Sequence, residues 1–337
     1  MLAIIIIILG TAFVLYTVLG GADFGAGIIE TFAGEKEEQT ISKAIAPVWE
    51  ANHVWLILAV VILFTGFPLV YSSLSQVLHI PLMLVLIGII FRGSAFTFRH
   101  YDVGHGRSHK YYSFLFKASS FITPMFLGIT LGALILGRIT FDQSVGFYEM
   151  FMSPWCNVFC FVMGMFSTSL FTYIAGVFLI PEATTAKERH KYFRFSRYAL
   201  LATIVSGVLV FFAAFYEGHS LIPDFFSSPI SITSFALIAI SIPFMLRLIR
   251  TNNSLLLRAG IGLQVAVILL GWFAIQYPTL IVVKGGDNLT FYNTHAPPAT
   301  LKQLLIALIV GLILVIPAFI FLFRVFKIKE RREGFLK

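Results

Sequence analysis

The chain has 337 residues, of which 58% are hydrophobic and only 12% are charged. A charged fraction about half that of an ordinary soluble domain excludes a soluble fold of this size, and the apolar content excludes intrinsic disorder. Because the sequence lacks the alternating segments of an outer-membrane barrel, we predict an all-α, polytopic transmembrane helix bundle. The net charge of +8 then reflects the orientation of the loops, and we expect no nucleic-acid partner.

Nine apolar stretches are long enough to cross a bilayer, which takes about 20 residues. The first has no basic region ahead of it and no small-residue cleavage site behind it, so we expect it to be retained as a helix. The short link 72–76 predicts that the second and third stretches form a tight antiparallel hairpin. In chain order the stretches are 2–20, 52–71, 77–98, 113–136, 155–180, 198–216, 230–248, 255–277 and 301–326.

The basic residues predict the orientation. If the N-terminus lies outside, 20 of the 24 Lys and Arg residues fall in cytoplasmic segments, and only Arg138, Lys284 and Lys302 fall outside. The positive-inside rule therefore predicts an outside N-terminus and a cytoplasmic C-terminus. Since every connection is too short for a folded domain, we predict a single transmembrane domain over 1–326 and a basic cytoplasmic tail over 327–337.

The first polar feature follows the first apolar stretch, in the sequence Gly20-Gly21-Ala22-Asp23-Phe24-Gly25-Ala26-Gly27. The spacing of Gly21 and Gly25, with Gly27 beyond them, is typical of helices that pack closely. Asp23 is costly inside a membrane and therefore needs a role. It is either a proton-relay group or a structural cap or ion-pair partner.

The second polar feature opens the next helix from the same side, in the sequence Trp49-Glu50-Ala51-Asn52-His53-Val54-Trp55. We expect Glu50 to lie at the depth of Asp23, near the inner boundary of the hydrocarbon, where protons from the cytoplasm would enter. Glu50 is a candidate relay, but an acid in the first turn of a helix also stabilises the helix dipole. His53 is expected to be a hydrogen-bonded packing residue.

The third feature is a pair of arginines on the third stretch. Arg92 and Arg99 are seven residues apart and therefore lie near one helix face. We expect Arg99 to extend to the interface. Arg92 lies deeper and should meet an acid, for which Asp23 or Glu50 has the right depth.

Metal and haem ligation by this chain look unfavourable. Cys156 and Cys160 lie four residues apart within an apolar run and are expected to be packing residues. His53 and His79 are expected at opposite faces of the membrane, and no residue is singled out as an axial haem ligand. We therefore predict no metal site and no haem in this chain.

These stretches together resemble subunit II of the cytochrome bd quinol oxidases. The resemblance rests on Gly21–Gly27, on Ala46–Leu56 and on Phe91–Arg99, in matching order, spacing and helix placement, and it extends to Tyr292–Pro317. The stretch Trp-acid-x-Asn-x-x-Trp and the stretch G-x-D-x-G-x-G are specific in combination. The resemblance therefore covers the chain from end to end.

The resemblance implies a heterodimer in a bacterial or archaeal cytoplasmic membrane. Subunit I would carry haems b and d and oxidise quinol, and the complex would reduce dioxygen to water. This chain would support assembly, haem-site stability and proton delivery from the cytoplasm through Glu50. A structural quinone in this subunit and small single-helix accessory subunits are further expectations. Trp49, Asn52, His53 and Trp55 would, with Arg92 and Arg99, have structural roles.

The sequence departs from the family pattern at two positions. Gly20 and Thr97 stand where many members have an acid, which suggests a divergent branch, either bd-like or cyanide-insensitive. The alternative function is a proton-coupled secondary transporter, because buried Asp23, Glu50 and Arg92 would also suit proton coupling. Against it, the sequence shows no matching pair of broken helices in its two halves.

Overall fold

A computed structural model describes residues 1–46, 49–101, 107–142, 144–248 and 254–334. Within these residues, nine helical segments are long and apolar enough to cross a membrane, and their positions confirm the nine predicted stretches. They are Leu2–Glu30, Trp49–Gly66, His79–Arg99, Ser108–Ile135, Val158–Glu182, Ala186–Tyr216, Pro229–Leu248, Ser254–Gln276 and Pro298–Leu322.

The first two spanning segments each consist of more than one element. Residues 2–30 comprise α1 (Leu2–Leu15), a π-helical turn (Tyr16–Gly20) and α2 (Gly21–Glu30). The second span comprises α4 (Trp49–Asn52) and α5 (Val54–Gly66). The remaining elements are α3 (Glu35–Ile45), α6 (Pro68–Val77), α7 (His79–Tyr101), α8 (Arg107–Ile135), α9 (Phe147–Phe151), α10 (Val158–Leu179), a 3-10 turn (Ile180–Glu182), α11 (Ala186–Tyr216), α12 (Leu221–Ser227), α13 (Pro229–Leu248), α14 (Ser254–Gln276), β1 (Thr279–Ile281), β2 (Leu289–Thr290) and α15 (Pro298–Gly334).

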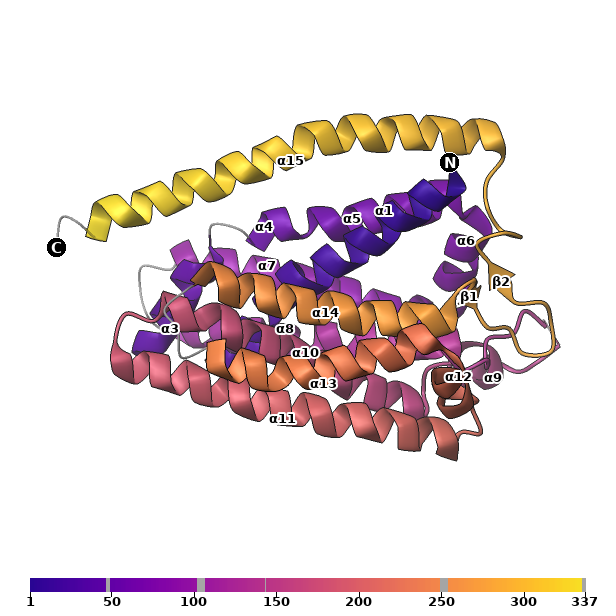
Figure 1. Ribbon diagram of the computed structural model, residues 1–337, viewed down its shortest axis with the longest axis horizontal. Helices are drawn as coiled ribbons and strands as arrows, with labels where there is room; N and C mark the ends of the chain where they lie inside the picture. Colours follow the sequence, from indigo (N-terminus) through magenta and orange to yellow (C-terminus); the bar gives the residue numbers. More distant parts are fainter. Residues whose placement is uncertain (47–48, 102–106, 143, 249–253, 335–337) are drawn as a thin grey trace.

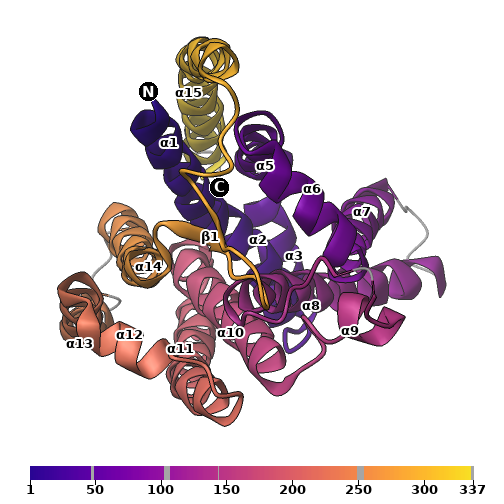
Figure 2. The same cartoon turned by 90° about the vertical axis from the view of Figure 1, so that its right-hand side faces the viewer.

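Helix α10 lies near the middle of the bundle, packed against α2, α8, α11 and α14 (Figure 2). Small residues permit this close approach, since a Cβ on Gly128 of α8 would lie 2.5 Å from the backbone oxygen of Met163 on α10. The helix begins at Asn157, whose side chain accepts a hydrogen bond from the backbone N–H of Cys160. The strands β1 and β2 form a small antiparallel hairpin between α14 and α15.

The two chain ends lie at opposite ends of the bundle, as an odd number of spans requires (Figure 1). We call the end that carries α3 and the end of α15 the inner end, following the predicted orientation, and the other the outer end. The buried apolar residues form two clusters. One contains Phe67, Phe159 and Phe291, and the other contains Phe24 and Phe171.

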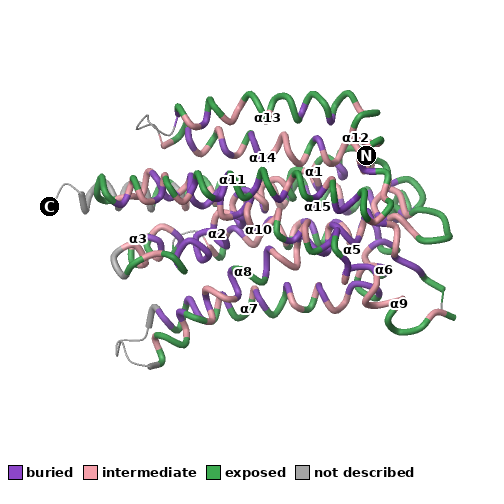
Figure 3. The backbone as a smooth tube through the Cα atoms, turned by 90° about the horizontal axis from the view of Figure 1, so that it is seen from below, coloured by how far each residue is buried: buried purple, intermediate pink, exposed green. Residues whose placement is uncertain are grey.

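The helices differ in how much of their surface this chain buries (Figure 3). More than half of the α10 span is buried (56%), whereas only 11% of the α15 span is. Helix α15 runs along one edge of the bundle beside α1 and α5 (Figure 1). Among the nine spans of the described residues, α15 therefore has the smallest buried share.

One local prediction is corrected. The expected link 72–76 is helical, because Pro68 starts a new helix, α6, which separates α5 from α7. Instead of pairing with α5, α7 packs on α8. Helix α15 continues as far as Gly334, and residues 335–337 lie outside the described part of the chain. The division into a transmembrane domain over 1–326 and a cytoplasmic tail over 327–337 stays a prediction.

Candidate functional site

A buried polar cluster lies where the π-helical turn and α2 meet the second spanning helix. Asp23 is 4% exposed, and its carboxylate accepts a hydrogen bond of 2.6 Å from the side-chain amide of Asn52. The same amide donates to the backbone carbonyl of Leu19 at 3.3 Å. The two polar stretches that are separate in the sequence therefore meet through Asn52.

Several polar atoms around this pair have no partner among the described residues. They are the Tyr16 hydroxyl, Asn52 Oδ1, His53 Nδ1 and Trp55 Nε1, all buried. The His53 ring lies between aromatic rings, with centroids 6.3 Å from Tyr16 and 6.0 Å from Phe24. Buried polar groups normally have hydrogen-bond partners, and such a concentration of unsatisfied ones marks a place for ordered water or a functional group.

Arg92 lies on the other side of Asp23 and is 1% exposed. Its guanidinium donates to the backbone carbonyl of Asp23 at 2.8 Å and to the Ser120 hydroxyl at 3.3 Å. It also lies 4.8 Å from the Phe24 ring centroid and 5.1 Å from that of Phe116. Of the two acids expected to meet Arg92, Asp23 does so, through its main chain, and Glu50 does not.

The glycines of α2 lie where neighbouring helices come closest. A Cβ on Gly25 would lie 1.9 Å from the backbone oxygen of Phe171 on α10. One on Gly21 would meet the Phe171 ring at 3.0 Å, and one on Gly27 would meet the Ser120 hydroxyl at 2.2 Å. These contacts hold the Asp23 backbone within reach of Arg92.

Arg99 was expected to extend to the membrane interface. It belongs instead to a second buried network. Its guanidinium forms a two-fold contact with Glu30, at 2.5 and 3.3 Å, and lies 3.2 Å from Glu38. Lys117 lies 3.8 Å from Glu30 and 3.7 Å from Glu38, and the Ser113 hydroxyl donates to Glu38 at 3.1 Å. Arg99 stays inside because these acids compensate its charge.

Glu30, Glu38 and Lys117 were not predicted as site residues. The spacing held a signal, because Glu30 follows Asp23 by seven residues, as Arg99 follows Arg92. Seven residues are about two helical turns, so two groups on α2 align with two arginines on α7. The contribution of Glu38 on α3 had no such signal, because it depends on how α3 folds back.

Glu50 lies apart from both networks. Its side chain is exposed on α4, and its carboxylate has no hydrogen-bond or ion-pair partner among the described residues. Its backbone carbonyl accepts from the N–H of His53 at 3.2 Å. Glu50 and Asn52 therefore share one short helix, but Asn52 points into the bundle while Glu50 points out of it.

The two tryptophans of this stretch pack against different helices. The Trp49 ring lies 5.6 Å from the ring centroid of Phe96 on α7. Trp55 is 7% exposed, and its ring lies 5.5 Å from that of Phe319 on α15. They hold the start of the second span between α7 and α15.

An ion pair also fixes helix α3 at the inner end. Lys191 of α11 donates to Glu37 at 2.9 Å. This hydrogen bond from Lys191 holds the pKa of the Glu37 carboxyl below its usual value. The pair attaches α3 to α11. Helix α3 also supplies Glu38 to Arg99.

Gly20 and Thr97, the two positions that depart from the family pattern, each have a distinct local environment. A Cβ on Gly20 would lie 2.9 Å from the Tyr16 ring, so that ring fills the space where a side chain would begin. Thr97 is exposed, and its hydroxyl donates to the backbone carbonyl of Gly93 at 3.0 Å. The assignment to a divergent branch stays a prediction.

His53 and His79 lie in different parts of the bundle. His53 is enclosed by aromatic rings in the inner half, whereas His79 starts α7 at the outer end, packs on Phe151 and contacts the Gln76 carbonyl at 2.9 Å. Within the described part of the chain, no group of three or more His, Cys, Asp or Glu residues is placed to hold a metal ion. Cys156 and Cys160 are both free thiols.

Comparison with known proteins supports the resemblance along the whole chain. The family described as cytochrome bd terminal oxidase subunit II matches residues 1–326. The cytochrome bd ubiquinol oxidase subunit 2 of Bacillus subtilis (strain 168) is 27% identical over 332 residues, which cover 95% of this chain and 94% of the relative. The cytochrome bd-I ubiquinol oxidase subunit 2 of Escherichia coli (strain K12) is 29% identical over 133 residues, covering 39% and 35%.

The fold has a match among solved structures as well. A chain of the bd oxidase from Geobacillus thermodenitrificans superimposes with a TM-score of 0.75 over 96% of this chain and 98% of that one, at 22% identity. With the family match over nearly every residue, the conclusion is direct: this chain belongs to the cytochrome bd terminal oxidase subunit II family.

Proposed function

We propose that this chain, as subunit II of a cytochrome bd-type quinol oxidase in a bacterial or archaeal cytoplasmic membrane, delivers protons to the haem-bearing subunit I. It would also support assembly and haem-site stability. The observation that carries the proposal is the exposed carboxylate of Glu50 at the inner end of the second spanning helix, which has no partner among the described residues. Family membership favours this function over the alternative of a secondary transporter.

Glu50 needs a polar environment that this chain does not supply. A carboxylate exposed to lipid within a spanning segment is costly, so water or another protein must cover it. The α15 face beside this helix is apolar and exposed at Ile313, Leu314 and Phe321. We infer that subunit I covers this face and, with it, Glu50.

The interior cluster would connect the cytoplasm to Glu50. Asn52 lies two residues from Glu50 and donates to Asp23. The unsatisfied atoms of Tyr16, Asn52 and His53 line the same region and suit a short chain of water molecules. Asp23 would be the interior relay group and Glu50 the group that faces the partner.

The haems supply the redox chemistry of dioxygen reduction. We expect haems b and d in subunit I, as the resemblance implies, and none in this chain. The residues of this chain would hold and transfer protons and stabilise the interface. The structural quinone and the accessory subunits stay predictions of the resemblance, without further support from the contacts described above.

The test is Glu50→Gln in the purified heterodimer. Gln keeps the size of the side chain but does not exchange a proton as the acid does. We expect oxygen consumption per haem to fall about tenfold or more, with haem content and elution volume unchanged. The matched control is Glu149→Gln, an exposed acid at the outer end that pairs with Lys284, and it should keep full turnover.

Two results would contradict the proposal. Full turnover per haem in an assembled Glu50→Gln complex would leave Glu50 as a helix-start residue. Loss of haem or of the heterodimer in that variant would instead make Glu50 a structural contact to subunit I. Asp23→Asn is then the second test of the relay, measured in the same way.

A further inference from the structure

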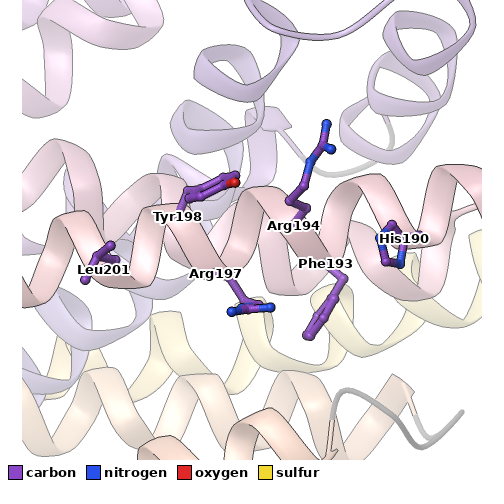
Figure 4. A pocket seen from close by; sticks show the side chains of 6 residues that line it. All are labelled: His190, Phe193, Arg194, Arg197, Tyr198 and Leu201. Carbon is purple, nitrogen blue, oxygen red and sulfur yellow. The ribbon is translucent and has the colours of Figure 1, made fainter.

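The inner half of α11 carries a hollow whose lining side chains, among the described residues, all come from that helix (Figure 4). Its volume is about 340 Å³. The lining residues are basic and aromatic, with one aliphatic residue at the end nearer the membrane centre. They are His190, Phe193, Arg194, Arg197, Tyr198 and Leu201.

These residues lie on one outward face of the helix. Positions 190, 194, 197 and 201 recur at the spacing of a helical stripe, and all four side chains are exposed. In Figure 4, Arg194 and Tyr198 extend toward one edge of this face, and Arg197 and Phe193 extend toward the other edge. The Arg197 guanidinium lies 5.8 Å from the Phe193 ring centroid.

The two arginines have no acidic partner among the described residues. Other basic residues nearby are paired, since Arg258 contacts Glu182 and Lys191 contacts Glu37. Arg194 and Arg197 therefore present positive charge on the periphery of the bundle, and no described acid compensates it. A guanidinium binds phosphate through two parallel N–H donors, which makes phosphate its favoured anionic partner.

The same face continues as an exposed apolar stripe. Val205 is 49% exposed, Val208 51% and Phe212 66%, and each follows the hollow at helical spacing. Such a stripe is the surface that acyl chains contact in a membrane. The basic end and the apolar stripe therefore together match an amphiphile, with an anionic head and a long apolar tail.

The length of α11 puts the hollow at the membrane boundary. Its 31 residues span about 46 Å, against about 30 Å of hydrocarbon. If Tyr216, next to the outer ion pair of Glu217 and Arg138, marks one boundary, the other falls near Arg197 and Tyr198. Tyrosine is typical of this headgroup level.

We propose that this face of α11 is a binding site for an anionic phospholipid of the bilayer. Arg194, Arg197 and the Tyr198 hydroxyl bind the phosphate. Phe193 and Leu201 contact the glycerol backbone and the first methylenes, and the acyl chain lies along the stripe from Val205 to Phe212. Basic pockets at a membrane surface recognise anionic lipid headgroups by this chemistry.

The test measures phosphatidylglycerol bound to the purified heterodimer by native mass spectrometry. R194Q/R197Q should weaken the tightest binding about thirtyfold, with haem content unchanged. The control K110Q/K187Q removes two exposed positive charges of the inner end that do not line the hollow, and it should keep the binding. An equal loss in both variants would reduce the effect to general surface charge and overturn the proposal.

Further measurements separate the sources of the anion and the occupant of the face. Inorganic phosphate should not displace the lipid, and full displacement by phosphate would mean a free-anion site instead. A benzophenone side chain at Val208 should give no adduct with subunit I, since an adduct would mean that the partner covers this face. If R194Q/R197Q does not assemble, R194K/R197K should bind several-fold more weakly, and unchanged binding would overturn the proposal.

Discussion

Arg92 and Arg99 are buried on the same helix, and their charges are stabilised in different ways. Arg92 donates to a carbonyl and a hydroxyl and lies over two aromatic rings. Arg99 is compensated directly by Glu30 and, less closely, by Glu38. In the second arrangement Glu30 makes the shorter, two-fold contact, so substitution of Glu30 should have the larger effect on Arg99.

We expect Glu30→Gln to destabilise the purified heterodimer by about 3–5 kcal/mol, because it leaves Arg99 buried with an incomplete partner. The measurement is thermal unfolding followed by loss of the haem spectrum. Glu149→Gln, which breaks the exposed pair with Lys284, should cost at most about 1 kcal/mol. Equal stability of the two variants would show that the Glu30 pair contributes nothing beyond an exposed one.

At the level of elements, helix α2 is placed by close contacts at its glycines. Gly25 faces the Phe171 carbonyl of α10 with no room for a methyl group, and Gly27 faces Ser120 of α8. The π-helical turn ahead of α2 brings the Leu19 carbonyl to Asn52, and such turns are common at functional sites. The position of Asp23 therefore depends on helix packing as well as on its own hydrogen bond.

Gly25→Ala should separate α2 from α10 and cost about 1–3 kcal/mol, the usual range for overpacking. Gly10→Ala is the matched control, since a Cβ there meets nothing within 4 Å and alanine favours the helix. The measurement for both variants is the amount of intact, tagged heterodimer that remains after incubation at a series of temperatures, determined by size-exclusion chromatography. If Gly25→Ala survives the same temperatures as Gly10→Ala, the α2–α10 contact is looser than described.

The pair of Glu37 and Lys191 adds a dependence on pH at the inner end. The pKa of Glu37 is lowered in the folded chain, so the stability that this pair contributes is present above the ordinary pKa of a glutamate. It is lost as the pH falls through the lowered value. Lys191→Gln should remove this acid sensitivity of α3. The measurement is protease cleavage within 35–45 over a pH series. A cleavage profile identical to that of the parent would show that the Glu37–Lys191 pair does not cause the pH dependence.

At the scale of the whole molecule, the segments rich in basic residues gather at one end of the bundle. The start of α11 and the end of α15 lie there, opposite the N-terminus (Figure 1). The distribution agrees with the predicted orientation, which itself is still to be measured. The outward faces of α11 and α15 then have different expected neighbours, lipid for the first and subunit I for the second.

The orientation can be tested with single cysteines in a chain whose Cys156 and Cys160 are replaced by alanine. Ser144→Cys lies in an exposed outer connection, and Thr184→Cys lies in an exposed inner one. A membrane-impermeant maleimide should label the first in intact cells and the second only after permeabilisation. The reverse pattern would invert the predicted topology.

The amino-acid sequence by itself determined the nine spans, their order and the family, because hydrophobicity and motif spacing are properties of consecutive residues. It also indicated that Arg92 should meet an acid, either Asp23 or Glu50. It did not predict that Asn52 joins the two polar stretches, that Glu38 completes the Arg99 network, or that Glu50 points outward. Those outcomes depend on the rotation of each helix about its axis and on where α3 folds back, which only packing between distant segments decides.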